Sequence, residues 1–264
     1  MSELLWAQDI CAGYGRENVL KKISFTVQEG ELCALLGSNG SGKSTLLRCV
    51  CGLLPFEGSM TLEGEQLLHM RQRCRAQRIG YLSQKGSVTP SLSTLDVVLM
   101  GFNPLLGLLQ SPGPAHRSWA LEVLRQVGAA QFADRDFITL SEGQKQLVLL
   151  ARTLVCQPRL IVLDEPDSAL DFHNRRQILE LLKAFSGAQG RAVLLCSHDV
   201  NIALAYADHL LLLQEGSLVH DLHLSTVSQN QLQLALQDIY GPVEVLRHGG
   251  RYLMMMCAKD QAPQ

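Results

Sequence analysis

Short apolar runs alternate with segments of helical spacing along much of this chain. Such runs are typical of strands buried on both faces of a parallel sheet. They occupy residues 31–36, 160–163, 192–196 and 210–213. Amphipathic helices are predicted from Lys43 to about Gly52 and over residues 174–185, because apolar residues recur there on one helical face. The alternation predicts an α/β fold with a mostly parallel sheet.

The two ends of the chain have other patterns. Ile23, Phe25 and Val27 alternate with polar residues before Glu29-Gly30, which predicts a half-buried strand and a turn. Near the other end, residues 228–239 predict a helix, and residues 243–257 predict a hairpin that turns at Gly249-Gly250.

The middle of the chain lacks a strand pattern between about Ser93 and Cys156. A helix-start signal precedes residue 97, and further helices are predicted over 116–127 and from Ser141 to Pro158. We therefore expect a helical subdomain at 85–157, inserted into a core formed by 1–84 and 158–220. Residues 221–264 are expected to form a short C-terminal extension of the same domain, 1–264.

Composition excludes several classes of protein. Of 264 residues, 47% are hydrophobic and 18% are charged, and this apolar content can offset the conformational entropy lost on folding, which argues against a disordered chain. The net charge of −2 argues against nucleic-acid binding through bulk basic charge. No run approaches the roughly 20 apolar residues that cross a bilayer, and residues 1–10 do not resemble a signal peptide. The eight cysteines form no CxxC pair, so we expect reduced thiols in a cytosolic protein rather than disulfides or a zinc site.

A glycine-rich loop separates the strand at 31–36 from the helix predicted to begin near Lys43. Its sequence matches G-x-x-x-x-G-K-[ST] and comprises Gly37, Ser38, Asn39, Gly40, Ser41, Gly42, Lys43, Ser44 and Thr45. Glycines let backbone N–H groups approach phosphates, and the helix N-terminus adds partial positive charge. Lys43 is expected to reach the β- and γ-phosphates and the Ser44 hydroxyl to bind Mg²⁺. The loop predicts nucleotide binding but does not specify a reaction.

Two carboxylates follow the buried strand at 160–163. Asp164 is expected to hold Mg²⁺ through its water shell, and Glu165 is placed to polarise an attacking water. Taken alone, the segment is also compatible with an ordinary strand-end turn. Its combination with the phosphate loop favours the catalytic interpretation.

The segment Leu140–Gln144 (Leu-Ser-Glu-Gly-Gln) resembles the signature motif of the ATP-binding subunits of ABC transporters. The resemblance covers about residues 4–220, and Glu142 departs from the glycine usual in the family. From the residues alone, Ser141 is also a suitable helix N-cap. The resemblance implies a P-loop NTPase core with a mostly parallel sheet, antiparallel N-terminal β strands and an inserted α-helical subdomain. It also implies an ATPase that uses ATP and Mg²⁺.

The same resemblance assigns roles to further positions. Tyr14 would stack on adenine, although a packing tyrosine in a turn is a serious alternative. Gln84 would sense Mg²⁺ and the attacking water, and His198 would contact the γ-phosphate. Ser168 and Asp171 would belong to the loop that crosses between protomers. The other seven of the eight histidines match no motif.

The resemblance further implies a head-to-tail homodimer, in which each ATP lies between one phosphate loop and the partner's signature residues. Those residues are Ser141, Glu142, Gly143 and Gln144. Catalysis is assigned to Glu165, His198 and Gln84, and the metal to Ser44, Gln84 and Asp164. No nucleic acid is expected as a partner.

Single copies of each motif favour a subunit of a multi-chain bacterial importer over a non-transport ABC ATPase or an ABC exporter subunit. Residues 94–101 and 134–137 are similar to subunits that import metal chelates, a group covering siderophores, haem, cobalamin and molybdate. This resemblance implies permease subunits and a substrate-binding protein as partners. It implies a peripheral location on the cytoplasmic face of the inner membrane.

Two segments have no place in these motifs. Arg71, Arg73, Arg75 and Arg78 are expected to form a solvated surface arm, with contact to lipid headgroups or a partner as the alternative. The apolar segment Leu105–Pro114 is a candidate for docking a membrane subunit, because exposed apolar loops tend to be interfaces. Packing inside its own subdomain is the alternative for that segment.

Overall fold

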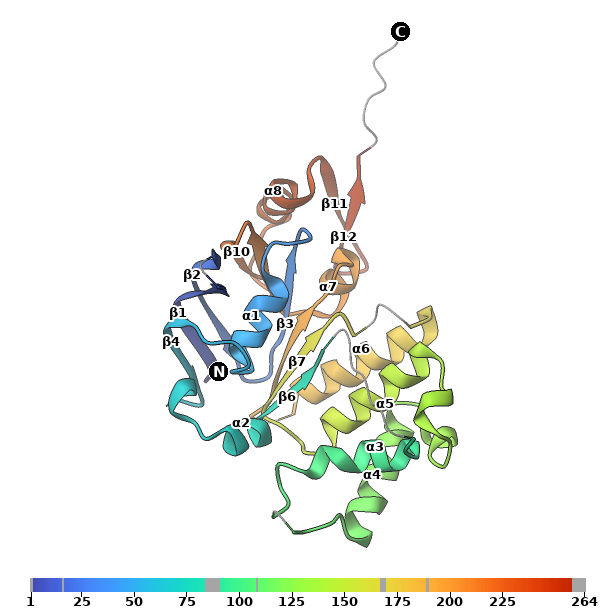
Figure 1. Ribbon diagram of the computed structural model, residues 1–264. Coiled ribbons are helices and arrows are strands. Elements are labelled where there is room, and N and C mark those ends of the chain that lie inside the picture. The colour runs from blue at the N-terminus through green and yellow to red at the C-terminus, as the bar shows by residue number, and fades with distance from the viewer. Residues whose placement is uncertain are drawn as a thin grey trace.

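A six-stranded sheet forms the centre of the computed structural model, which describes residues 2–15, 17–83, 91–107, 109–166, 170–188 and 190–257. The strand order is β10-β9-β3-β8-β7-β6. Their bounds are Leu32–Gly37 (β3), Ile79–Leu82 (β6), Leu160–Asp164 (β7), Ala192–Cys196 (β8), His209–Gln214 (β9) and Ser217–His223 (β10). All neighbours pair in parallel except β9 and β10, so the prediction of a mostly parallel sheet is confirmed (Figure 1).

A second sheet, which is antiparallel, packs against the first. Its strand order is β2-β1-β4-β5. The bounds are Glu3–Tyr14 (β1), Glu17–Gln28 (β2), Glu57–Leu62 (β4) and Glu65–Gln66 (β5). Ile23, Phe25 and Val27 are buried, as their alternation with polar residues predicts. The antiparallel N-terminal strands expected from the resemblance are therefore present.

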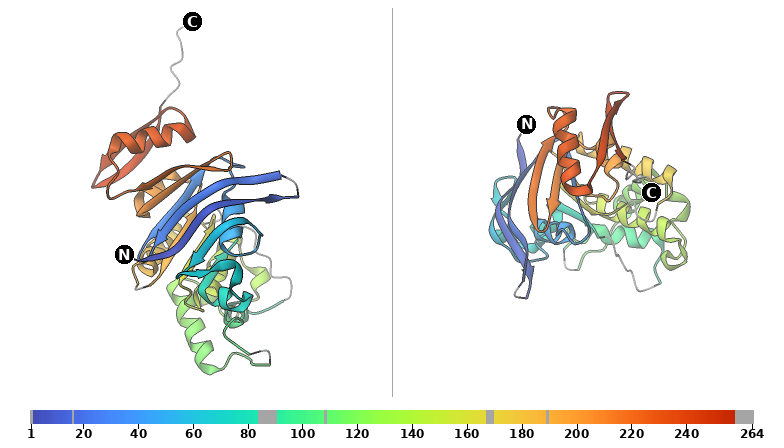
Figure 2. Two further views of the ribbon diagram at one scale, coloured as in Figure 1. Left: turned by 90° about the vertical axis from the view of Figure 1, so that its left-hand side faces the viewer. Right: turned by 90° about the horizontal axis from the view of Figure 1, so that it is seen from above.

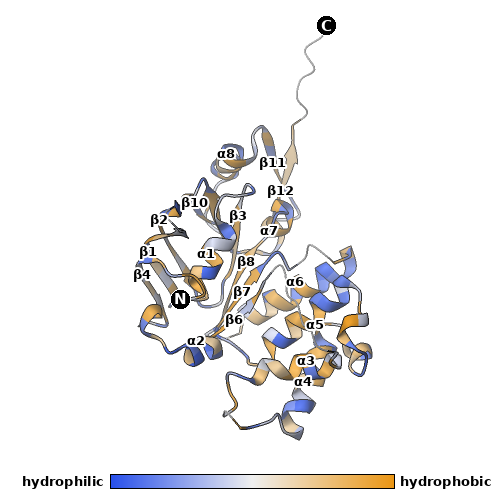
Figure 3. Cartoon of the chain, viewed as in Figure 1, coloured by the Kyte–Doolittle hydropathy of each residue, from blue (hydrophilic) through white to orange (hydrophobic). Residues whose placement is uncertain are grey.

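The central sheet is apolar on both faces, which explains why its strands are continuous hydrophobic runs (Figure 3). Ile161 and Leu163 of β7 pack into the cluster formed with the helices of the middle segment. Leu160 and Val162, which point the other way, pack with the antiparallel sheet and α1 (Lys43–Val50). Alternate residues of one strand thus belong to two separate cores.

Helices fill the segment between β6 and β7. They are α3 (Thr94–Leu99), α4 (Pro114–Gln126) and α5 (Glu142–Leu154), joined by short 3-10 helices at Met100–Phe102, Ala130–Phe132 and Phe137–Thr139. Ser93 starts α3 as predicted, because its hydroxyl accepts a hydrogen bond from the backbone N–H of Asp96 at 3.1 Å. Together with α6 (Phe172–Ser186), these helices cover one face of the sheet.

The C-terminal elements pack beside β9 and β10. They comprise α7 (Val200–Tyr206), α8 (Gln229–Tyr240), β11 (Val243–His248) and β12 (Arg251–Met256). Residues of α7, α8 and β11 share an apolar cluster with β3 and β9. In both views of Figure 2 the orange β9–β10 hairpin lies between the blue N-terminal strands and the red C-terminal elements. Residues 221–223 belong to β10, so the central sheet extends past residue 220.

The arginine-rich segment is a short helix, α2 (Gln72–Arg78), that follows the 3-10 helix Leu67–His69. Arg73 donates hydrogen bonds to the backbone carbonyls of Pro104 and Leu106, and Arg75 donates to that of Gly52. Arg71 and Arg73 are exposed, as expected of a surface segment, but the segment is also tied to the rest of the chain. The guanidinium groups of Arg73 and Arg75 fasten α2 to neighbouring loops.

All eight cysteines are free thiols, and four of them, Cys33, Cys49, Cys51 and Cys196, are buried. None of the helices in the described ranges has the length and apolar character needed to span a membrane.

Candidate nucleotide-binding site

The glycine-rich loop connects the end of β3 directly to the start of α1, as predicted. Gly42 has φ 103°, in the left-handed region that favours glycine. A Cβ atom at Gly37 would lie 2.2 Å from the carbonyl oxygen of Leu213, so the loop also requires glycine where it leaves the sheet. These two positions set the loop's curvature at the N-terminus of α1.

Lys43 is held inside this loop. Its side chain is buried, and Nζ donates hydrogen bonds to the carbonyl oxygens of Gly37 at 2.9 Å and Ser38 at 3.0 Å. The backbone therefore fixes the ammonium group beside the loop. Such a fixed positive charge suits a phosphate ligand.

Ser44 and Asp164 are brought together, although 120 residues separate them in the sequence. The hydroxyl of Ser44 donates a hydrogen bond to Oδ1 of Asp164 at 3.1 Å. Burial raises the pKa of Asp164, the Ser44 hydrogen bond lowers it, and the charge of Glu165 raises it further; the net shift is upward. The hydroxyl of Ser44 and the carboxylate of Asp164 are adjacent oxygen ligands, and burial leaves the negative charge of Asp164 poorly solvated. Both features suit Mg²⁺, which prefers hard oxygen donors.

Glu165 and His198 meet across the ends of two parallel strands. Asp164 pairs with Cys196 in the β7–β8 ladder, and the chain leaves the sheet just after both. Glu165 has φ 53°, and its backbone N–H donates to the carbonyl of Cys196 at 3.1 Å. His198 Nε2 contacts the carboxylate Oε1 of Glu165. The left-handed backbone conformation of Glu165 is one that residues of functional sites often adopt.

A cavity of about 530 Å³ unites these groups, within the size range of small-molecule sites. It is lined by residues of the loop, the end of β7 and the end of β8, together with one residue of β2. The lining residues are Val19, Asn39, Gly40, Gly42, Lys43, Ser44, Thr45, Glu165 and His198. Val19 was not predicted, because an apolar residue in a strand carries no sequence signal of a ligand contact.

Other predicted site residues lie elsewhere on the molecule. Tyr14 does not line this cavity; it is about half exposed, and its hydroxyl accepts a hydrogen bond from Arg48 of α1 at 2.9 Å. Asp171 caps α6 by accepting a hydrogen bond from the N–H of Asn174 at 2.8 Å. Gln84 and Ser168 lie outside the described residues.

The signature residues form the N-terminus of α5. Ser141 and Gln144 make a reciprocal capping box, with the N–H of Gln144 donating to Ser141 and the N–H of Ser141 donating to Gln144. Glu142 is exposed and pairs with Lys145 at 2.8 Å. None of the residues Ser141–Gln144 lines the cavity described above.

A model of the ABC transporter family matches residues 20–168, more than half of the chain. The chain belongs to the ABC transporter ATP-binding family. Two curated relatives illustrate the similarity. Hemin import ATP-binding protein HmuV of Bordetella avium is 35% identical over 264 residues, covering 96% of this chain and 99% of that protein. Manganese transport system ATP-binding protein MntB of Bacillus subtilis is 38% identical over 208 residues, covering 78% and 81%.

Solved structures show the same ABC fold. An inward-facing metal-chelate type ABC transporter superposes with a TM-score of 0.78 at 27% identity, covering 96% of each chain. A dimeric ATP-binding cassette, bound to ADP and Pi in a post-hydrolysis state, gives 0.76 at 28% identity and covers 83% of this ABC protein and 98% of that chain. The recognition of the family and the predicted fold class are confirmed. The chain is an ATP-binding ATPase domain whose relatives include importer subunits.

Proposed function

We propose that this ABC protein hydrolyses ATP to power uptake of a metal-containing solute through a separate membrane permease. The cavity where Lys43, Ser44, Glu165 and His198 converge is the observation that carries the proposal. It places a fixed cation, a hydroxyl and a carboxylate around one space. These are the groups that phosphoryl transfer to water requires.

Phosphate binding is assigned to the loop 37–45, with Lys43 facing the β- and γ-phosphates. Ser44 and Asp164 would hold Mg²⁺, which when bound neutralises charge on those phosphates. Gln84, which lies outside the described residues, is proposed as a further metal and water contact.

Hydrolysis is assigned to Glu165 as the general base. Its carboxylate accepts a proton from water while the water oxygen bonds to the γ-phosphorus and the bond to the bridging oxygen of ADP breaks. His198 contacts the same carboxylate, so it orients Glu165 and stands next to the γ-phosphate position. Tyr14 is proposed to stack on adenine, with Arg48 fixing its hydroxyl.

Each complete site is proposed to need a second copy of the chain. Ser141 and the N–H groups near Gly143 open a helix, so they offer a second anion-binding terminus. Because they lie outside the cavity of their own protomer, they are assigned to the ATP of the partner. Ser168, outside the described residues, and Asp171 are assigned to the loop between protomers.

Permease subunits and a substrate-binding protein are the proposed partners, with the ATPase peripheral on the cytoplasmic face of the membrane. We assign residues 1–84 and 158–223 to the core, because β10 ends at His223, and residues 85–157 to the helical subdomain and 224–264 to the extension. The segment Leu105–Pro114 is the proposed permease contact, because Leu105 is 46% exposed and Leu109 is 97% exposed. Hemin and manganese import by relatives indicates a metal ion or a metal chelate as the cargo.

The test of the base assignment is Glu165→Gln, measured by phosphate release and by gel filtration with ATP. Loss of a general base should lower turnover by roughly 100-fold or more, while ATP binding persists and a closed dimer accumulates. Glu215→Gln is the matched control, because Glu215 has a similar φ of 47° in the β9–β10 turn, outside the cavity.

Lys43→Ala separates binding from chemistry, because it should lose nucleotide affinity rather than turnover alone. Normal steady-state hydrolysis by the Glu165→Gln variant would refute the role of Glu165. Unchanged ATP affinity in the Lys43→Ala variant would refute the phosphate site itself.

A further inference from the structure

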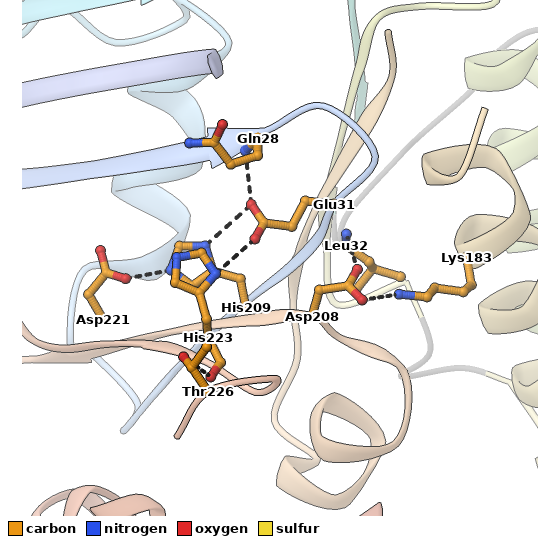
Figure 4. Close-up of polar contacts among 9 residues, drawn as sticks. All are labelled: Gln28, Glu31, Leu32, Lys183, Asp208, His209, Asp221, His223 and Thr226. Atoms are coloured by element: carbon orange, nitrogen blue, oxygen red, sulfur yellow. Dashed lines mark hydrogen bonds and ion pairs between the residues drawn. The ribbon is translucent and has the colours of Figure 1, made fainter. Parts of the chain in front are cut away.

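Three side chains that could ligate a metal converge at the edge of the central sheet opposite the nucleotide cavity. Glu31 immediately precedes β3, His209 begins β9 and His223 ends β10 (Figure 4). Because β3 and β9 run in parallel, Glu31 and His209 lie at their amino ends, whereas the phosphate loop follows their carboxyl ends. None of the three residues lines the nucleotide cavity.

The donor atoms face one another at short range. The carboxylate of Glu31 lies beside the two rings, with Oε2 3.5 Å from Nδ1 of His209 and Oε1 3.2 Å from Nδ1 of His223. One ligand atom from each residue can be chosen so that all three lie within 4.8 Å of one another. The two imidazole rings stack, with centroids 4.1 Å apart.

The backbone fixes all three positions. His223 lies directly opposite His209 in the β9–β10 ladder, and its carbonyl accepts a hydrogen bond from the N–H of Thr226 at 3.1 Å. Asp208 accepts a hydrogen bond from the N–H of Leu32 at 2.9 Å and pairs with Lys183, which holds β9 against β3 (Figure 4). The N–H of Gln28 donates to Oε2 of Glu31 at 2.8 Å. The backbone positions of the three ligands are therefore preorganised.

His209 supplies an independent indication of a ligand. Its side chain is 1% exposed, and within the described part of the chain Nδ1 makes no hydrogen bond, although Oε2 of Glu31 lies 3.5 Å from it. The other ring nitrogen, Nε2, contacts the carboxylate of Asp221. A histidine that binds a metal through one nitrogen commonly donates its other N–H to a carboxylate, which fixes the tautomer.

We propose that Glu31, His209 and His223 form a binding site for a divalent transition-metal ion of the zinc class. Zinc binds histidine nitrogen and carboxylate oxygen at about 2.0–2.1 Å, which gives a tetrahedral edge of about 3.3 Å between ligand atoms. The separations of 3.2 and 3.5 Å, one from each oxygen of Glu31, are close to that edge, so a small rotation of the carboxylate brings one oxygen within reach of an ion bound by both rings. The stacked rings must turn relative to each other for both Nδ1 atoms to face one ion, and the side chain of His223, which is 46% exposed, has the room to do so.

An open coordination position and an entry path are present. Glu31 and His223 line a cavity of about 520 Å³ that also contacts Lys183, Asp208 and Tyr252. The fourth ligand is then a water molecule on the cavity side. The ion joins the starts of β3 and β9 to the end of β10, independently of nucleotide.

Zinc binding to the full-length protein, measured against a competing chelating indicator, tests this site. The expected result is one saturable Zn²⁺ per chain that His223→Ala weakens at least about tenfold, the lower limit for losing even an outer partner of a metal. His220→Ala is the matched control, because His220 lies on the same strand but pairs with Asp238 at 2.8 Å. It should leave zinc affinity within about twofold of the unmodified protein.

A second variant and a second readout separate ligation from folding. Glu31→Gln should also weaken binding, and Co²⁺ should give the intense visible absorption of a tetrahedral site in the unmodified protein but not in either variant. Melting in chelator should show that His223→Ala still folds, since this side chain is half exposed. No saturable zinc binding, or equal affinity in His223→Ala and His220→Ala, would overturn the proposal and leave an ion-paired histidine between Glu31 and Asp221.

Discussion

At the scale of single residues, the nucleotide site concentrates negative charge that its surroundings do not fully compensate. Asp164 is buried and lies next to Glu165, and both effects raise its pKa. The hydrogen bond from Ser44, a contact with Cys196 and the charge of Arg48 lower this pKa but do not cancel the rise. A site arranged in this way favours a bound cation. It also costs stability when the cation is missing.

Asp164→Asn tests whether the charge of Asp164 lowers the stability of the nucleotide-free protein. A carboxyl whose folded pKa is raised above its unfolded value binds protons more tightly in the folded state, so stability falls as pH rises through the folded pKa. At pH 7 the ionised form therefore destabilises the nucleotide-free protein. The asparagine variant should melt higher, by about 2–4 °C for each kcal/mol relieved in a chain of this size, while hydrolysis is lost.

Scanning calorimetry of the nucleotide-free variants provides the measurement. Asp171→Asn is the control, because asparagine caps a helix as well as aspartate does, so α6 should be unaffected. An equal or lower melting temperature for Asp164→Asn would show that this carboxylate is not under electrostatic strain.

At the scale of elements, the buried strands, the amphipathic helices and the sequence motifs were predictable. Contacts between residues far apart in the sequence and irregular strand pairing were not. The strands β3, β7, β8 and β9 and the helices α5 and α6 follow from periodicity, because both faces of the sheet or one face of the helix are buried. The loop and Asp164-Glu165 were predictable because their chemistry depends on local sequence. Val19 and the pairing of Tyr14 with Arg48 depend on tertiary contacts that no local pattern encodes.

The cluster of Glu31, His209 and His223 shows most clearly what the sequence alone does not predict. Ser217 pairs with Gln214 at the β9–β10 turn, and counting outward from that pair would place Leu222 opposite His209. A register shift between Leu218 and His220 places His223 there instead. A one-residue shift moves side chains to the other face, so this histidine pair could not be read from the sequence.

The contacts of α2 lead to a prediction at the same scale. Arg73 donates to the carbonyls of Pro104 and Leu106, so Arg73→Ala should loosen the segment 101–107. Losing about 1 kcal/mol of hydrogen bonding should speed amide exchange in that segment roughly fivefold. Arg71→Ala, at the exposed start of the same helix, is the control. Mass spectrometry measures the amide exchange rate of this segment. Equal rates in the Arg73→Ala and Arg71→Ala variants would rule out a role of Arg73 in holding the segment.

At the scale of the whole molecule, the proposed functions occupy separate regions. The nucleotide cavity lies at the carboxyl ends of β3, β7 and β8. The signature residues begin α5, one of the helices that form the helical segment (Figure 1). The proposed metal site lies at the amino ends of β3 and β9. Because the signature residues do not line the cavity of their own chain, ATP-driven association of two chains is the step that would complete each site.

Glu142 provides the sharpest test of that association. Its carboxylate is paired with Lys145 and exposed at the terminus proposed to meet the partner's γ-phosphate, where a negative charge opposes a negative ligand. In a Glu165→Gln background, Glu142→Gly should tighten ATP-dependent dimerisation, by roughly tenfold for 1.4 kcal/mol of repulsion removed. Sedimentation with and without ATP measures the dimerisation constant.

Two further variants isolate the charge from the backbone in this test. Glu142→Gln removes the charge and keeps a helix-favouring side chain, so it should also tighten the dimer, whereas Lys145→Ala leaves Glu142 unpaired and should weaken it. The salt dependence of dimerisation should change in Glu142→Gln, because the variant removes one repulsion that salt would otherwise screen. A dimerisation constant that none of the three substitutions changes would mean that the N-terminus of α5 does not face the nucleotide of a second chain.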